Sequence, residues 1–212
     1  MVSAGVGTRP PYPPNVSDKR VPAHVGHYAG AVNADAIETA RLRLRPFAAD
    51  LSDLDALHEI QSDATHMRFY PHPFSREESR AWIERSLDRQ GRFGYSLWAI
   101  EDRETGEFLG NCGPIPQVVD GMDEVEIGWS VTPRRARQGI ATEAAAAWRD
   151  HCFGVLGMEH VISLIRPENA PSRGVAERIG MTVWKETIHG IDRWLHLVYR
   201  IDAVGPSAPP SP

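Results

Sequence analysis

One stretch of this sequence limits the fold more than any other, because in it a strand leads through a glycine-containing loop into an alanine-rich helix. Residues 126–131 end a predicted strand, and after Thr132 and Pro133 residues 134–144 read RRARQGIATEA. The N-terminus of a helix presents unpaired N–H groups and a partial positive charge, which both suit a phosphate group. Gly139 and Ala141 would let the backbone approach an anion closely. The same pattern also describes an ordinary helix start with a basic first turn, and it lacks the glycine spacing of a P-loop or a dinucleotide-binding turn.

Hydrophobic periodicity switches between strand-like and helix-like spacing along the rest of the chain. Two-residue spacing predicts strands at residues 40–45, 95–101, 107–112 with a continuation toward 119, 124–131, 160–166, 181–188 and 194–201. Helical spacing predicts helices at residues 51–60, 75–91, 139–153 and 171–179. Turn residues at 102–106 and 120–121 predict an antiparallel meander. This order of elements predicts an α+β fold, in which a mixed sheet carries helices on both faces.

Proline is concentrated at the two ends of the chain. Five of the 17 prolines fall in residues 1–36 and four in residues 203–212. Segments of this composition bury too little apolar surface to offset the entropy lost on ordering. We therefore expect a flexible arm at residues 1–36, one domain at residues 37–202 and a disordered tail at residues 203–212.

Composition excludes several classes of protein. The formal net charge of −5 argues against nucleic-acid binding, which normally requires a basic surface. Two cysteines, Cys112 and Cys152, provide neither a disulfide framework nor a CxxC metal site, and we expect no bound metal. No apolar run is long enough to span a membrane, and no signal-peptide pattern opens the sequence, so we expect a cytoplasmic protein.

Several segments, taken in order, carry a family resemblance: residues 38–47 (ETARLRLRPF), 126–129 (EIGW), 138–144 (QGIATEA), 169–172 (NAPS) and 177–181 (ERIGM). Together they resemble the GNAT acyltransferases, in particular the RimJ/RimL branch of ribosomal-protein N-terminal acetyltransferases. The resemblance spans residues 37–201. One departure is Ala136, which occupies the first position of the family's Q/R-x-x-G-x-G/A cofactor loop.

The resemblance implies a mostly antiparallel sheet whose fourth and fifth strands, here residues 124–131 and 160–166, splay apart to admit the pantetheine arm of acetyl-CoA. The edge of the fourth strand at Ser130 and Val131 would pair with pantetheine, with the Val131 N–H polarising the thioester carbonyl. Asn169 and Ser172 occupy positions that contact coenzyme A in the family; otherwise Asn169 only starts a helix and Ser172 is only exposed. The pyrophosphate would bind the backbone of Arg137, Gln138, Gly139, Ile140, Ala141 and Thr142.

Glu126 is the candidate general base, since acetylation of an amine requires removal of a proton. The alternative is a solvated strand carboxylate. Ser172 and Tyr199 are candidates for the general acid, although Tyr199 also fits a packed strand position, which we favour. Cys112 and Cys152 lie within regular elements as small apolar residues, so direct attack on the thioester is preferred to a covalent acetyl-cysteine.

Candidates for lining the acceptor site are drawn from the connection between the first two helices and from the central strands. As an alternative, Phe69 and Tyr70 belong to the core. The candidates are His66, Phe69, Tyr70, Asn111 and Trp129.

The sequence therefore predicts an acetyl-CoA-dependent N-acetyltransferase, monomeric or homodimeric, that acts on a primary amine of a protein N-terminus or a small molecule. A non-catalytic module that binds or senses acyl-CoA is the alternative. A sensor would need the pyrophosphate loop but not the base.

Overall fold

The computed structural model describes residues 36–190 and 192–204. The predicted arm and tail lie outside these residues, apart from residues 36, 203 and 204. Within the described ranges, eight strands form one sheet in the order β1-β2-β3-β4-β5-β6-β8-β7. The strands are β1 (Ile37–Glu38), β2 (Leu42–Arg45), β3 (Trp98–Asp102), β4 (Phe108–Val119), β5 (Met122–Val131), β6 (His160–Ile165), β7 (Thr182–His189) and β8 (Trp194–Asp202). The helices are α1 (Leu54–Gln61), α2 (Arg76–Phe93), α3 (Ile140–Gly154) and α4 (Ala170–Arg178), with short 3₁₀ helices at His66–Phe69 and Pro133–Arg135.

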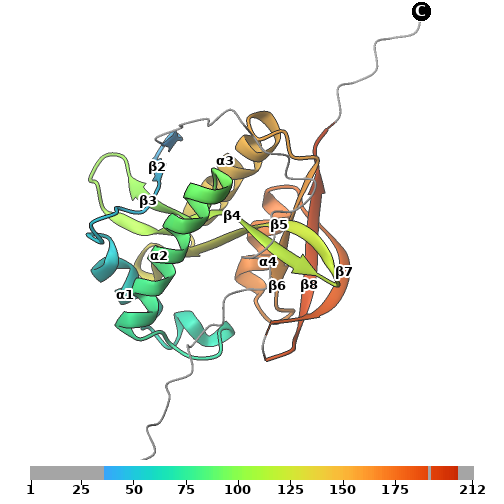
Figure 1. Ribbon diagram of the computed structural model, residues 1–212, viewed down its shortest axis with the longest axis horizontal. Coiled ribbons are helices and arrows are strands. Elements are labelled where there is room, and N and C mark those ends of the chain that lie inside the picture. The colour runs from blue at the N-terminus through green and yellow to red at the C-terminus, as the bar shows by residue number, and fades with distance from the viewer. Residues whose placement is uncertain (1–35, 191, 205–212) are drawn as a thin grey trace, which may run out of the picture.

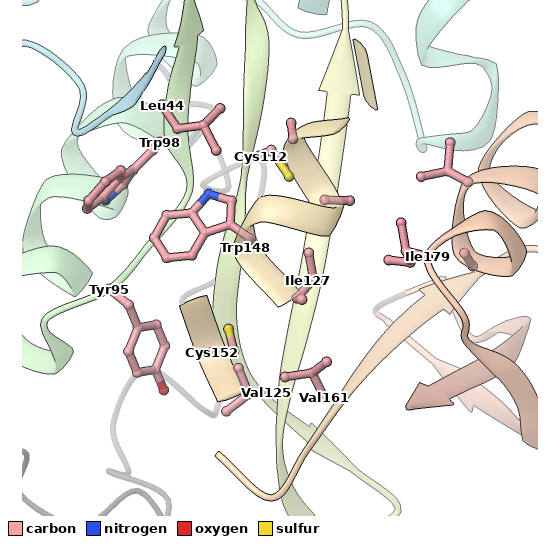
Figure 2. Packing of buried hydrophobic residues seen from close by; sticks show 14 of the residues in the cluster. Leu44, Tyr95, Trp98, Cys112, Val125, Ile127, Trp148, Cys152, Val161 and Ile179 are labelled. Carbon is pink, nitrogen blue, oxygen red and sulfur yellow. The ribbon is translucent and has the colours of Figure 1, made fainter. Parts of the chain in front are cut away.

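The helices cover both faces of the sheet, which confirms the predicted α+β class. Apolar side chains of α1 and α2, including Leu57 and Ile83, pack with Leu97 and Ala99 on one face. On the other face α3 and α4 form the larger core, in which Trp148 lies edge-on to Trp98 with ring centroids 4.7 Å apart. Figure 2 shows Trp148 at the centre of this core, between strand residues and Cys152.

The β4–β5 hairpin is the longest paired unit of the sheet. Its register runs without a shift from Gly110 opposite Val131 to Val119 opposite Met122. Asp120 and Gly121 form the connecting turn, both with positive φ (52° and 83°), as a two-residue hairpin turn requires. In Figure 1 the hairpin crosses the molecule and its tip reaches β7, where Asp120 accepts hydrogen bonds from Lys185 and Thr187.

The sheet opens between β5 and β6. These neighbours are parallel, whereas every other pair of the eight strands is antiparallel, and they are in register at one position, Glu126 with Ile162. Beyond that position toward the C-termini no further register pair joins the two strands. The predicted splay between the strands at residues 124–131 and 160–166 is thereby confirmed, and the short β1 makes these strands the fifth and sixth.

The predicted helix boundaries at two glycines were wrong for reasons of backbone geometry. Gly91 was expected to end the second helix, but α2 continues to Phe93 and ends at Gly94, whose φ of 77° is left-handed. A helix tolerates an internal glycine at a modest cost, whereas a left-handed cap favours glycine. Gly139, expected as the first residue of the third helix, is its N-cap and also left-handed, with φ 79°.

Ser75 begins α2 with a complete capping box: its side chain accepts from the Glu78 N–H, and Glu78 accepts from the Ser75 N–H. Ser75→Ala should lower the free energy of unfolding by about 1 kcal/mol. The midpoint of thermal unfolding would then fall by a few degrees in calorimetry. Ser75→Asn, which keeps an acceptor at the N-cap, should unfold close to the wild-type temperature. Equal losses in both variants would contradict the capping role.

Candidate active site

The edge of β5 that faces the gap presents backbone groups in a fixed alternation. The Thr132 N–H donates to the Leu109 carbonyl at 2.8 Å, so even-numbered residues of β5 turn their peptide groups toward β4. The peptide groups of Ile127, Trp129 and Val131 therefore face β6. This agrees with the expected role of the Val131 N–H. The same alternation turns the Ser130 peptide group toward β4 and away from the gap. Only the side chain of Ser130 therefore remains available to a ligand.

The loop between β5 and α3 has two residues in left-handed conformation. Arg137 has φ 62° and Gly139 has φ 79°. Left-handed residues next to right-handed ones turn successive N–H groups toward one side, which makes a concave anion site. The first N–H groups of α3 follow directly at Ile140, Ala141 and Thr142, and Gly139 provides no side-chain cap for them. The loop thus presents unpaired N–H groups of the kind that bind anions.

Of the three arginines before α3, two are engaged elsewhere. Arg134 forms an ion pair with Glu59 and Arg135 with Glu107. Arg137 is exposed and forms no ion pair with any residue from 36 to 190 or 192 to 204. It is therefore the arginine placed to supply counter-charge where Ala136 cannot.

Arg41 fixes the other side of this loop, a role that sequence reasoning missed. Its Nη1 donates to the Gln138 carbonyl at 2.9 Å, and its Nε donates to Glu143 at 2.7 Å. Burial opposes ionisation of Glu143, but bonds from Thr39 and Arg41 outweigh it and lower the pKa of Glu143. Glu143, in the first turn of α3, therefore stays ionised. Its negative charge is balanced by Arg41, so it does not oppose a bound anion.

Glu126 lies where the sheet opens. Its Oε2 accepts a hydrogen bond of 2.7 Å from Gln117 Nε2, and its Oε1 accepts one of 3.2 Å from the Leu164 N–H on β6. Burial raises the pKa of Glu126 above the ordinary value, while these two bonds and the charge of Arg89 act in the opposite direction. A carboxylate with a raised pKa is a stronger base than an exposed one. Glu126 is not the freely solvated strand carboxylate of the alternative interpretation.

Three predicted residues meet beyond Glu126 on the same face of the sheet. His66 Nε2 lies 2.8 Å from Ser130 Oγ, and the tautomer of His66 decides which group donates. Burial lowers the pKa of His66, which favours the neutral ring. Asn111 pairs with Ser130 across β4 and β5 and is 2% exposed, and its Nδ2 has no hydrogen-bond partner among the described residues. This cluster starts four residues from Glu126, about 13 Å along the strand.

The remaining acceptor-site candidates do not all lie in the same place. Phe69 and Tyr70 are half-buried, with Arg68 over the Phe69 ring at 4.4 Å and Phe74 edge-on to Tyr70. The Trp129 side chain packs against the core formed by α3, on the opposite face from His66 and Asn111. The structure therefore does not bring the Trp129 side chain together with the other candidates. Its N–H faces the gap instead.

Asn169 and Ser172 form the start of α4. The Asn169 side chain accepts from the Ser172 N–H at 3.2 Å and so caps the helix, while the Ser172 side chain is half-buried. Tyr199 is 1% exposed. Its hydroxyl accepts from Arg173 Nε and donates to Glu177, contacts that are typical of a packed tyrosine.

Cysteine chemistry finds little support. Cys112 and Cys152 are buried free thiols, and burial strongly raises the pKa of each, so neither is an activated nucleophile. Within the described ranges no three His, Cys, Asp or Glu side chains are grouped as metal ligands. None of the helices in that part of the chain is both long and apolar enough to cross a membrane.

An open parallel edge beside an anion-binding loop defines a class of protein that takes up an extended, phosphate-bearing ligand in the manner of an added strand. Comparison with known proteins narrows this class. The sequence profile of the acetyltransferase (GNAT) domain matches residues 41–182. The chain belongs to the GNAT family and is an acyltransferase whose reaction is acetyl transfer.

Individual relatives agree. The uncharacterized protein YkkB of Bacillus subtilis (strain 168) is 35% identical over 143 residues, 68% of this chain and 83% of YkkB. The uncharacterized N-acetyltransferase YnaD of the same organism is 30% identical over 147 residues, 68% of this chain and 81% of YnaD. An acetyltransferase crystal structure from Agrobacterium tumefaciens is 30% identical, with a TM-score of 0.66 over 78% of this chain and 93% of that one.

The RimJ/RimL branch is also represented among structures of the same fold. A RimL structure, a ribosomal L7/L12 alpha-N-protein acetyltransferase in complex with coenzyme A, has a TM-score of 0.62 over 79% of this chain and 98% of that one. Its sequence identity of 20% makes this a likeness of fold.

Proposed function

We propose that this protein is an acetyl-CoA-dependent N-acetyltransferase that transfers the acetyl group directly to a primary amine. The observation that carries the proposal is the position of Glu126, a carboxylate of raised pKa at the point where β5 and β6 separate. A module that only bound acyl-CoA would need the gap and the loop but no base there.

The residues around the gap fit acetyl-CoA. The N–H groups from Gly139 to Thr142 and the Arg137 side chain would hold the pyrophosphate. The exposed β5 edge at Trp129 and Val131 would bond the pantetheine amides as a neighbouring strand does. One of these two N–H groups would then polarise the thioester carbonyl. Acetyl-CoA supplies an activated acyl group and a thiol leaving group.

Residues of the protein would carry out the proton transfers of the reaction. Glu126 accepts a proton from the attacking amine through one water molecule, which is the task of a general base. The amine nitrogen bonds to the carbonyl carbon, the C–S bond breaks, and the departing sulfur takes a proton. His66 and Ser130 would line the acceptor side, because they lie on the same face as Glu126, with Asn111 buried beside Ser130. The acceptor is a protein N-terminus or a small-molecule amine.

For the general acid, Ser172 is the better candidate because the Tyr199 hydroxyl is buried between Arg173 and Glu177. Ser172→Ala should lower turnover about tenfold with little change in the unfolding temperature. Tyr199→Phe should cost about 1 kcal/mol of stability through its lost hydrogen bonds and leave turnover near wild type. Steady-state rates and calorimetry on both variants check this. The reverse pattern would assign the acid to Tyr199.

The proposal is tested by thiol release from acetyl-CoA against a panel of amines that includes short peptides with free N-termini, lysine and small aromatic amines. We expect thiol release to match the N-acetylated product, measured by mass spectrometry, for at least one class. Binding of acetyl-CoA without amine-dependent thiol release would favour the sensing module.

A further inference from the structure

We propose that Ser163 is a positioning residue that, together with Glu126, holds the β5–β6 gap open by occupying the two backbone groups that would otherwise close it. This inference rests on the proposed function, in which the gap receives pantetheine. Ser163 lies in the middle of β6, between residues that are all apolar from Val161 to Ile165.

A missing rung of the ladder is the first observation. In the register set by Glu126 and Ile162, the next parallel hydrogen bond would join the Leu164 N–H to the Ile127 carbonyl. Both groups have side-chain partners instead. The Ser163 hydroxyl donates to the Ile127 carbonyl at 2.7 Å, and the Leu164 N–H donates to Glu126 at 3.2 Å. The ladder therefore stops where two side chains replace its bond.

The two side chains act from opposite faces of the sheet. Ser163 alternates with Val161 and Ile165, which belong to the core beneath α3 and α4. Glu126 points to the other face, where Gln117 holds its second oxygen at 2.7 Å. Two side chains, one on each face of the sheet, thus replace the backbone bond between the Leu164 N–H and the Ile127 carbonyl. Neither backbone group is left unpaired, so neither draws the strands together.

Burial gives these bonds their effect. Ser163 is 2% exposed, so water cannot readily replace its hydroxyl at the Ile127 carbonyl. A buried carbonyl without a partner is costly. Without the hydroxyl, the Ile127 carbonyl would be satisfied by the Leu164 N–H, and the ladder would advance by one rung into the gap, formed by this bond and the next one, from the Trp129 N–H to the Leu164 carbonyl. Acetyl-CoA would then have to break this rung in order to bind.

The test is Ser163→Ala, measured by acetyl-CoA calorimetry, steady-state kinetics and hydrogen exchange of the free protein. We expect the dissociation constant to rise about five- to tenfold, the effect of one net hydrogen bond. Turnover at saturating acetyl-CoA should stay within about twofold of wild type, because bound ligand restores the open gap. Exchange of the Leu164 and Trp129 amides should slow, since closing strands protect them.

Ser86 offers a matched control. It is also 2% exposed, and its hydroxyl donates to the Trp82 carbonyl at 2.9 Å within α2. Ser86→Ala should leave both acetyl-CoA affinity and the exchange of these two amides unchanged. Should Ser163→Ala fail to fold, Ser163→Cys, a weaker donor of similar size, should change both quantities in the expected direction.

Unchanged affinity and unchanged exchange in the Ser163 variant would overturn the inference, as would an equal affinity loss in Ser86→Ala. The exchange measurement needs no ligand, so it separates this inference from the proposed function. A wild-type protein that does not bind acetyl-CoA would refute the function, and slowed exchange in Ser163→Ala would still show that Ser163 keeps the strands apart.

Discussion

Gly139→Glu should weaken acetyl-CoA binding by at least about a hundredfold in calorimetry. Gly139 is the N-cap of α3 in left-handed conformation, and the N–H groups behind it form the candidate pyrophosphate site. A glutamate there would place a side chain and a negative charge where the phosphates are expected to lie. A Cβ at this position would meet only Arg41 Nη2, at an ordinary contact distance of 3.4 Å, so steric strain would come from the left-handed backbone, with φ 79°.

Gly139→Asn separates charge from backbone strain. Asparagine tolerates left-handed φ better than other non-glycine residues and carries no charge. We expect it to weaken binding only a few-fold, with circular dichroism showing both variants folded. If a folded Gly139→Glu protein binds acetyl-CoA with near-wild-type affinity, the loop does not hold the pyrophosphate.

The loop before α3 and the order of helices and strands could be predicted from the sequence, because both depend on local rules. Period-two and helical spacing reflect which face of each element is buried, and the two glycine-containing turns fix where the chain reverses. The expected separation of the strands around Glu126 and His160 depended on family resemblance. The local sequence pattern of neither strand indicates that their pairing ends after one position.

What the sequence did not reveal depends on contacts between distant residues. Trp129 looked like a pocket residue, yet alternation along a strand in unbroken register turns its side chain to the α3 face. Ser163 and Gln117 gained significance only when their partners on β5 were known. The one available signal for Ser163 was a polar residue inside an apolar strand, which predicts a buried hydrogen bond but not its partner.

The same distinction applies to the charged residues before α3. Three arginines looked equivalent in the sequence, and the structure separates them by the carboxylates that reach them from α1 and from the residue before β4. Arg137 differs from the other two by its left-handed backbone, and it forms no ion pair with any of the described residues. The proposed contribution of Arg137 to cofactor binding therefore depends on the tertiary fold, whereas the change at Ala136 can be read from the sequence alone.

Glu126→Gln should lower turnover at neutral pH by roughly ten- to a thousandfold, the range expected for loss of a general base. Glutamine keeps the shape of the side chain and an oxygen that can accept from the Leu164 N–H, so the gap should stay open and acetyl-CoA affinity nearly constant. Glu186→Gln on β7 removes the same charge from an exposed position and should leave turnover unchanged.

The pH dependence distinguishes a base from a residue that only orients the amine. Wild-type activity should fall as the pH decreases through the raised pKa of Glu126, because the protonated carboxyl cannot accept the amine proton. The deficit of Glu126→Gln should shrink at higher pH, where the amine is already deprotonated. A deficit equal at every pH would make Glu126 an orienting residue, and no deficit would leave catalysis to proximity and the backbone N–H groups of β5.

Glu126→Ala should in addition weaken acetyl-CoA binding, since it removes both the base and one of the two side chains that hold the strands apart.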